Sequence, residues 1–480
     1  MRGAANLKAP AGDVAGDVID LATREHLGER ALARAVLSNA FLQRLSRPES
    51  KPNDHAPVWL KELRRAAFQW VSERGFPAAK DESWKYTQIG PILEIPFEPA
   101  QADASRRPSS AAIDQLAGDL GGIRLVFVNG HFAPDCSSLK QLPQGAKVES
   151  LASALAAEDE SLEALLARPF GEQTHAFTAL NAACAEDGAF VQIPANTVIE
   201  EPIHLVFLAD PGGAVQPGPV VSHPRSLVLA GPGSRVTIVE TYAGILDEVT
   251  LTNAVTEVVL KEGAAVEHYK VQNETETAFH IALLDVRQER DTRFTTHSVA
   301  LGSLLARHEV TVRLHGPGAT TTLNGLYMPQ NEQHLDNPTT IDHVAPECTS
   351  RELYKGVVDW RGRGVFNGRV VVRPGAMKTD SSQTNKNLLL SESAQANTRP
   401  QLEIFADDVK CAHGAAVGQL DEEAVFYLRS RGIPQLAARD LLTYAFVGEM
   451  LELILVEPLR SHVEKLVASR LPAGGAGVAA

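Results

Sequence analysis

Cysteine is scarce in this sequence, with four residues in 480. Cys136, Cys184, Cys348 and Cys411 lie far apart along the chain, and none belongs to a Cys-x-x-Cys pair. This usage excludes a disulfide framework and a zinc ribbon, because both need grouped cysteines. The cysteines therefore predict a protein of a reducing compartment.

Long apolar segments are also missing. The start, "MRGAANLKAPAGDVAGDVIDLATREHL", contains no apolar run of seven or more residues, so we expect no secretory signal. The most apolar late segment, "LLTYAFVGEMLELILVEPL", carries Glu449, Glu452 and Glu457, which an ordinary membrane span would not tolerate. We expect a cytoplasmic protein that does not cross a membrane.

Basic residues are the minority, with 45 Lys and Arg against 59 Asp and Glu and a formal net charge of −14. This surplus of negative charge repels a phosphate backbone, so nucleic acid is not expected as the main ligand. The motifs GxxxxGK[ST], GxSxG and HExxH do not occur in the sequence. Motifs therefore predict no catalytic residue, and we expect no enzyme.

Strand patterns fill the middle of the chain, from residue 188 to residue 390. Units of strand, glycine turn and strand recur there, and the turn glycines are 30, 55 and 57 residues apart. One interval of about 30 and two near its double are typical of coils in a stacked repeat. The pattern predicts a mainly β fold built as a parallel β-helix, with a β-sandwich as the alternative. The glycines concerned are Gly233, Gly263, Gly318 and Gly375.

Both ends of the chain show helical patterns instead. Residues 16–75 place apolar side chains at helical spacing, and Gly75 is a plausible helix stop. The chain becomes helical again from Asp421, where acidic residues open the pattern. We expect four regions: an N-terminal helical region with a loop (1–120), a mixed connecting segment (121–169), the parallel β-helix (170–410) and a C-terminal helical subdomain (411–480).

Cys411 and His413 are the clearest candidates for a site. In an extended segment, residues two apart point to the same face, so both side chains could reach one metal or one partner surface. Thiolate and imidazole suit iron or zinc, but two ligands do not make a metal site. From local spacing, a buried structural role is the commoner explanation for an isolated cysteine.

Other candidates carry weaker signals. His343 and Cys348 lie five residues apart beside Asp342, and His334 precedes them, but nucleophile and base pairs form in space rather than in sequence. We expect packing and surface roles for these residues. The adjacent acids Asp407/Asp408 and Glu422/Glu423 are more typical of a solvated loop and of a helix start than of a catalytic pair.

An apolar stripe in the C-terminal region predicts a packing or docking face. Leu442, Phe446 and Met450 are the candidates for contact with a partner, and part of the stripe must instead be internal core. The wider stripe consists of Leu441, Leu442, Ala445, Phe446, Met450, Leu453 and Ile454.

Several long motifs of this sequence, and the order in which they occur, resemble the SufB/SufD family of iron-sulfur cluster assembly proteins. The resemblance covers nearly the whole chain after about residue 60. Gly414 after His413, followed by "VGQLDEE", is more similar to the SufD branch than to the SufB branch. The motifs are "KDESWKYT", "RLVFVNGHF", "DGAFVQIPANTVIEEPIHLVF", "DHVAPECTSRELYKGVVDWRGRGVFNGRVVV", "KTDSSQTNKNLLLS" and "NTRPQLEIFADDVKCAHGAAVGQLDEEAVFYLRSRGI".

The resemblance implies a right-handed parallel β-helix between helical regions, acting as a non-catalytic scaffold. It implies pairing with SufB edge to edge, docking of the SufC ATPase through the C-terminal helices, and a cluster held only transiently near the SufB junction. It gives His413 a role at that junction, as a possible transient metal ligand, and leaves Cys411 open between ligand and core. A homodimer without SufB, a flavin on the complex and the role of the first 60 residues stay open. The alternative function is a carbohydrate-active β-helix enzyme, a lyase or hydrolase.

Overall fold

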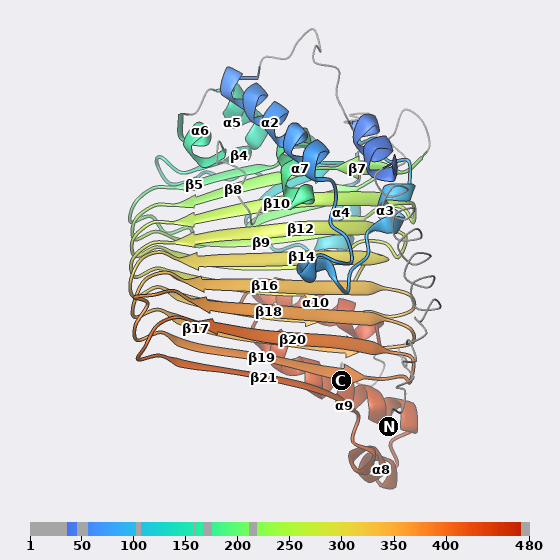
Figure 1. Ribbon diagram of the computed structural model, residues 1–480. Coiled ribbons are helices and arrows are strands. Elements are labelled where there is room, and N and C mark those ends of the chain that lie inside the picture. Colours follow the sequence, from blue (N-terminus) through green and yellow to red (C-terminus); the bar gives the residue numbers. More distant parts are fainter. Residues whose placement is uncertain are drawn as a thin grey trace, which may run out of the picture.

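The computed structural model describes residues 36–45, 56–101, 107–157, 160–166, 175–210 and 218–471. Residues 1–35 of the expected N-terminal helical region, most of the expected loop at residues 48–57 and the tail after residue 471 lie outside the described residues. The described chain forms a β-solenoid with helices on both of its faces (Figure 1).

Two parallel sheets form the solenoid, and the chain alternates between them. We call them the N-side sheet and the C-side sheet, after the helices that cover them. Every pair of neighbouring strands from β8 and β9 onward is parallel, which a β-sandwich of antiparallel hairpins would not show. The prediction of a mainly β fold with a parallel β-helix between helical ends is therefore confirmed.

The strands of the solenoid are about ten residues long in its second half. The N-side sheet contains β4 (Lys147–Ser150), β5 (Ala189–Ile193), β8 (Arg225–Ala230), β10 (Thr250–Leu260), β12 (Phe279–Gln288), β14 (Leu305–Leu314), β16 (His334–His343), β18 (Arg363–Val372) and β20 (Gln395–Ile404), with β1 (Glu98–Pro99) and β7 (Val220–Ser222) at its side. The C-side sheet contains β2 (Ile123–Val128), β3 (His131–Phe132), β6 (Ile203–Ala209), β9 (Arg235–Gly244), β11 (Ala265–Asn273), β13 (Arg293–Ala300), β15 (Thr320–Tyr327), β17 (Thr349–Val358), β19 (Asp380–Leu389) and β21 (Lys410–Gln419).

The register explains the glycine spacing in the sequence. Cα partners in successive coils of the N-side sheet include Leu251, Phe279, Leu305, His334 and Arg363, which are separated by 26 to 29 residues. One coil therefore has nearly the length of the shortest glycine interval. All four turn glycines have positive φ, a conformation that side chains rarely adopt.

Side chains alternate between the lumen, which we define as the space between the two sheets, and the outer faces. On β14, Val310, Val312 and Leu314 face the lumen and belong to one continuous buried cluster, whereas Thr311 and Arg313 face outward. The large apolar area removed from water in this cluster is the main stabilising contribution to the solenoid.

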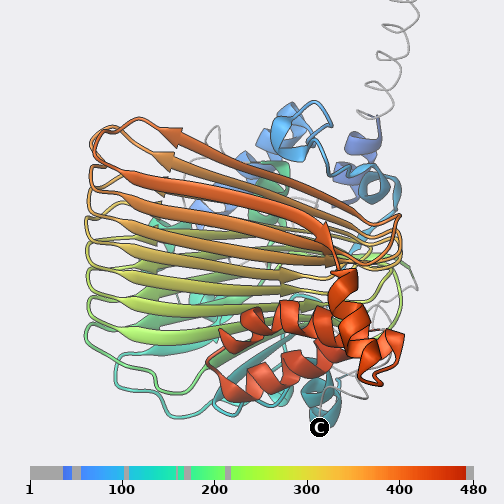
Figure 2. The ribbon, with the colours of Figure 1, turned by 90° about the horizontal axis from the view of Figure 1, so that it is seen from below.

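The N-terminal helices cover the outer face of the N-side sheet (Figures 1 and 2). Residues 36–45 are helical, and α2 (Val58–Arg74) is followed by Gly75, whose φ is 70° and whose N–H donates to the Val71 carbonyl. Helix α4, in contrast, packs on the C-side sheet. The named helices of this region are α2 (Val58–Arg74), η1 (Glu82–Trp84), α3 (Gly90–Glu94), α4 (Ser110–Ala117), η2 (Pro134–Cys136), α5 (Leu151–Ala156), α6 (Glu160–Leu166) and α7 (Ala176–Cys184).

The C-terminal helices α9 (Gln435–Glu452) and α10 (Glu457–Ser469) lie on the opposite side, against the C-side sheet (Figure 2). Helix α8 (Glu422–Ser430) packs on α9 and lies beyond β21 (Figure 1). Strand β21 continues to Gln419, beyond the expected start of the helical subdomain at residue 411. None of the helices in the described part of the chain is long and apolar enough to span a membrane.

Candidate functional site

The last coil leaves one end of the solenoid open. Strands β20 and β21 pair only with β18 and β19, and their outer edges meet no strand among the described residues. Every residue of β20 is at least partly exposed, and nine of the ten residues of β21 are exposed. At the other end of the solenoid, antiparallel β3 and β4 and the side chains of Leu142 and Ala146 cover the lumenal core. Within the described residues, the β20/β21 end therefore leaves two long strand edges and the lumen uncovered, and it presents free backbone groups to a partner.

Apolar side chains lie at this open end. Ile404 is 42% exposed, Phe405 is 59% exposed and Val417 is 45% exposed. Leu402, facing the lumen from β20, is only partly buried against the core cluster. An unpaired strand edge beside exposed apolar side chains is typical of a protein–protein interface. If no partner covers it, such an edge favours aggregation.

Cys411 and His413 both lie on β21, facing the lumen at this end. Their Cα register partners on β19 are Ser381 and Gln383, which are buried inside the lumen. Cys411 packs against the lumenal core, whereas the imidazole of His413 is exposed and has no hydrogen-bond or ion-pair partner within the described residues. Both side chains thus stand at the mouth of the lumen, where a partner would meet them.

The environment of Cys411 favours its thiol form. Burial raises the pKa of the Cys411 thiol, the nearby Asp380 carboxylate raises it further, and the Ser381 backbone opposes the rise. A thiol of raised pKa carries little thiolate at neutral pH, and thiolate is the form that binds metal. In the isolated chain, Cys411 is therefore suited to packing rather than to metal binding.

Two residues that no sequence motif singled out lie next to His413 in the lumen, on the preceding strands of the C-side sheet. The Gln383 side-chain amide donates from Nε2 to Glu352 Oε2 at 2.6 Å, and both residues are buried in the lumen. Burial raises the pKa of Glu352 to about 7, against smaller lowering effects of the Thr339 hydroxyl and the Gln383 amide. The signal that could have found them is the coil length, because Gln383 precedes His413 by one coil and Glu352 precedes it by two.

The other sequence candidates do not come together as a site. His343 Nε2 shares a hydrogen bond with Ser350 Oγ at 2.9 Å inside the lumen. Burial lowers the pKa of His343 to about 4. Cys348 is buried, with its thiol donating to the Gly316 carbonyl at 3.4 Å, and burial raises its pKa. Asp342 faces outward in a two-bond ion pair with Arg373. No group of three or more His, Cys, Asp or Glu side chains within the described ranges is arranged to hold a metal ion.

The remaining candidates have local structural roles. His334 accepts or donates a hydrogen bond to Thr87 Oγ1 at 2.9 Å. Asp408 occupies a turn with φ of 54°. Glu422 and Glu423 open α8, where negative charge is favourable to the helix dipole.

The structure places the three docking candidates largely inside. Met450 is 5% exposed within the cluster between α9 and the C-side sheet, and Leu442 and Phe446 are partly buried against the same cluster. The Lys355 ammonium donates to the Phe446 carbonyl at 2.7 Å and pairs with Glu449. These side chains attach α9 to the solenoid. The exposed apolar residues of this region are Phe426, Tyr427, Leu436 and Leu455.

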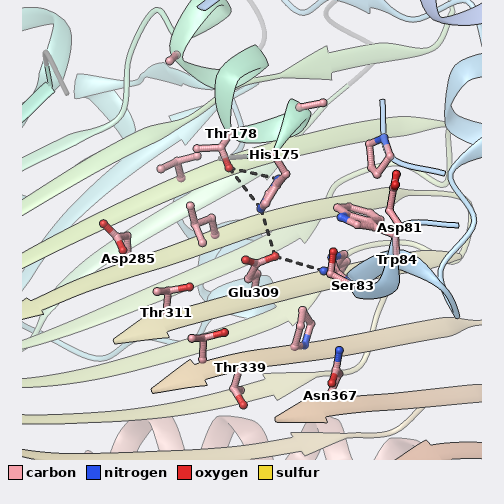
Figure 3. Close-up of a pocket in the computed structure, with 18 of the residues that line it drawn as sticks. Asp81, Ser83, Trp84, His175, Thr178, Asp285, Glu309, Thr311, Thr339 and Asn367 are labelled. Atoms are coloured by element: carbon pink, nitrogen blue, oxygen red, sulfur yellow. Dashed lines mark hydrogen bonds and ion pairs between the residues drawn. The ribbon is translucent and has the colours of Figure 1, made fainter. Parts of the chain in front are cut away.

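A polar groove of about 810 Å³ lies between the N-terminal helices and the outer face of the N-side sheet (Figure 3). Glu309 is at its centre: His175 Nε2 lies 3.2 Å from its carboxylate and Arg307 lies 3.3 Å from it. Burial alone would raise the pKa of Glu309, but His175 and Arg307 outweigh burial and lower it to about 2. Glu257 and Asp285 are likewise paired with arginines.

This groove is therefore not the site of a glycosidase-like general acid, which needs a carboxyl of raised pKa. Its network instead fastens the "DESWKYT" segment to the sheet. The Arg307 guanidinium lies 3.9 Å above the Trp84 ring, and Thr87 Oγ1 donates to Asp336 Oδ2 at 2.5 Å. Trp84 also stacks on Phe177 of α7, with ring centroids 5.8 Å apart.

Comparisons with known proteins agree with this architecture. Residues 214–446 match the family model "SUF system FeS cluster assembly, SufBD core domain", and residues 38–205 match "SufBD protein N-terminal region". The chain belongs to the SufBD family. The two matched regions cover both the solenoid and most of the N-terminal helical region, and the first ends inside α9.

Relatives in the SufBD family match over most of their length. A SufBD family protein of Synechocystis sp. is 34% identical over 85% of this chain and 90% of its own. The iron-sulfur cluster assembly protein SufD of Escherichia coli is 32% identical over 85% of this chain and 92% of its own. A chloroplastic protein of Arabidopsis thaliana, ABCI7, is 30% identical over 91% and 92%. The family places this chain in iron-sulfur cluster assembly with a SufD-like role.

Proposed function

We propose that this chain is a non-catalytic scaffold subunit that pairs with a SufB subunit through the open end of its solenoid. The observation that supports this most is the pair of unpaired edges on β20 and β21, beside exposed Ile404, Phe405 and Val417. A second parallel solenoid could continue both sheets across the junction and cover the lumen. In the absence of SufB, a second copy of this chain would use the same end.

The cargo of the complex would be an iron-sulfur cluster, held transiently rather than as a resident cofactor. His413 would meet it at the junction, because its imidazole is exposed at the mouth of the lumen and lacks a partner in the described chain. Cys411 would contribute packing first, and ligation only where a partner charge lowers its pKa. The assembly would act in the cytoplasm without nucleic acid or membrane.

SufC, an ATPase, is the second proposed partner, and α8 with the start of α9 is its proposed docking surface. Phe426 is 71% exposed and Leu436 is 61% exposed, and Tyr427 lies beside them in α8. Leu442, Phe446 and Met450, which attach α9 to the sheet, would support this surface from beneath. Large exposed apolar side chains near one another are a common mark of a binding surface.

Co-expression with SufB and SufC, followed by affinity capture and iron and sulfide analysis, tests the proposal. A Val417→Asp substitution places a charge at the open end and should strongly reduce SufB capture while SufC capture persists. Val58→Asp is the matched control, because Val58 is 72% exposed in α2, far from that end in the fold. Equal SufB capture by both variants would contradict the proposed interface.

A further inference from the structure

A column of polar side chains leads from the open mouth into the lumen. Glu352 on β17, Gln383 on β19 and His413 on β21 are consecutive Cα register partners, and all three face the lumen. Parallel strands lie about 4.8 Å apart, so the column covers about 10 Å from the exposed imidazole to the buried carboxyl. Gln383 is the only residue between them in this register.

The bonding of Gln383 is incomplete. Its Nε2 donates to Glu352 Oε2 at 2.6 Å, but within the described chain its Oε1 and the Glu352 Oε1 have no hydrogen-bond partner. Both side chains are more than nine-tenths buried, so an unpaired oxygen costs free energy there. A Cβ on Gly368 would stand 2.2 Å from the Gln383 Nε2, and the glycine thus leaves room for the amide. The fold accommodates this amide but does not pair its carbonyl.

Glu352 faces no cation in this part of the lumen. The inward positions of β18 and β20 carry no titratable side chain, and β16 contributes only His343, which burial keeps neutral with a pKa of about 4. Tyr327 and Tyr354 face the lumen from β15 and β17, and burial raises the pKa of both. Without a charged partner, Glu352 has a pKa of about 7, and both of its protonation states are populated near neutral pH.

We propose that Glu352 acts as a positioning residue which, through the Gln383 amide, sets the ring tautomer that His413 presents at the junction. The inference rests on the proposed function, because it takes His413 as the residue that meets the cargo. When Glu352 is ionised, it accepts from the Gln383 amide N–H, and the Gln383 carbonyl is free to hold a ring N–H of His413. The other ring nitrogen then presents its lone pair outward.

Protonation of Glu352 by a proton from solvent reverses this arrangement. The carboxylic acid donates to the Gln383 carbonyl, the amide turns round, and its N–H groups face His413. His413 then accepts from Gln383 and presents its ring N–H outward, which cannot bind a metal. A hydrogen bond to one ring nitrogen determines the role of the other, as in most histidine sites.

Nitrogen NMR of the full chain with labelled histidine tests the coupling without any partner. His413→Ala assigns the signals. From pH 6 to pH 8 the ionised fraction of Glu352 should rise from about a tenth to about nine tenths, and the tautomer ratio of neutral His413 should change with it. Glu352→Gln and Gln383→Leu should abolish the change. A tautomer ratio independent of pH in the unsubstituted chain overturns the inference.

The co-expressed complex with SufB and SufC supplies the second measurement. Iron and sulfide content after loading at pH 6 and pH 8 should differ for the unsubstituted complex and be equal for Glu352→Gln. Glu240→Gln, a lumenal carboxyl outside the column, is the matched control, and melting temperatures verify folding. If even the unsubstituted complex acquires no cluster, the proposed function fails, while the NMR result still decides the inference.

Discussion

At the scale of single residues, charged side chains between the N-terminal helices and the N-side sheet form ion pairs with one another. Arg307 is among the largest fully buried side chains; it pairs with Asp336 and Glu309 and stacks on Trp84. Removing one partner of such a buried set leaves uncompensated charge, which costs more than the set contributed. Arg307 is therefore a sensitive position.

We expect Arg307→Met to destabilise the protein by about 3–5 kcal/mol, because Asp336 would lose its cation while staying buried. Arg361→Met is the control: Arg361 is largely exposed and pairs with Glu332 at the surface, where ion pairs contribute little. Urea unfolding followed by circular dichroism measures both. Similar unfolding midpoints for the two variants would contradict the role given to Arg307.

A second prediction at this scale concerns His413. His413→Ala should lower the iron and sulfide content of the co-expressed complex without changing the melting temperature of the chain, because the exposed ring makes no described internal bond. His315→Ala, at an exposed position in a solenoid turn, should leave both unchanged. A lowered melting temperature for His413→Ala would instead indicate a structural role.

Sequence reasoning reached part of this site. The spacing of Cys411 and His413 places both on one face of any extended segment, because side chains alternate with a period of two. Glu352 and Gln383 were not reachable in the same way. Successive coils here differ by several residues in length, and an error of one residue moves a side chain to the other face of the sheet.

At the scale of elements, local patterns predicted the strands and helices well, but not which side of a helix is buried. The apolar stripe of α9 is wide, and the sequence alone could not show that Met450 faces the sheet while Phe426 and Leu436 face solvent. Strand β21 was also missed as the final strand, because its small and polar residues lack the usual apolar alternation. Its pairing with β19 establishes it as a strand.

The docking surface on α8 and α9 gives a prediction at this scale. Phe426→Asp and Leu436→Asp should abolish SufC capture while leaving the circular dichroism of the chain unchanged, because both side chains are exposed. Deleting residues 421–480 would be a poor test, since it would expose apolar side chains of the C-side sheet such as Val271 and Leu326. Leu455→Asp, at another exposed position between α9 and α10, is the matched control. Undiminished SufC capture by both α8 and α9 variants would exclude this surface.

At the scale of the whole molecule, the solenoid has two faces covered by helices and one open end. The N-terminal helices cover one face of the solenoid and the C-terminal helices cover the other, so the open end is the direction in which the sheets can continue (Figure 2). The lumen itself, filled with side chains, includes several buried histidines.

Several buried histidines predict that the protein loses stability in acid. Burial lowers the pKa of His204 to about 3 and that of His297 and His343 to about 4, below the ordinary value of about 6.5 in an unfolded chain. As the pH falls below 6.5, these histidines bind protons in the unfolded chain but stay neutral in the native chain. Stability is therefore complete above pH 6.5 and decreases toward pH 4. For a folded pKa near 4, the loss at pH 5 is about 2 kcal/mol per histidine.

Glu352 opposes this trend over part of the range. Its folded pKa of about 7 lies above its unfolded value, so its contribution to stability decreases as the pH rises from 4.5 to 7. Burial also raises the pKa of Asp187. Because three or more histidines act against these two carboxyls, we expect the melting temperature to fall between pH 6.5 and pH 5. Scanning calorimetry of His343→Gln should show a shallower fall than the unsubstituted chain, whereas His413→Gln, altered only at the exposed mouth, should reproduce the original slope. A melting temperature that rises toward pH 5 would mean that the buried histidines accept protons in the folded state.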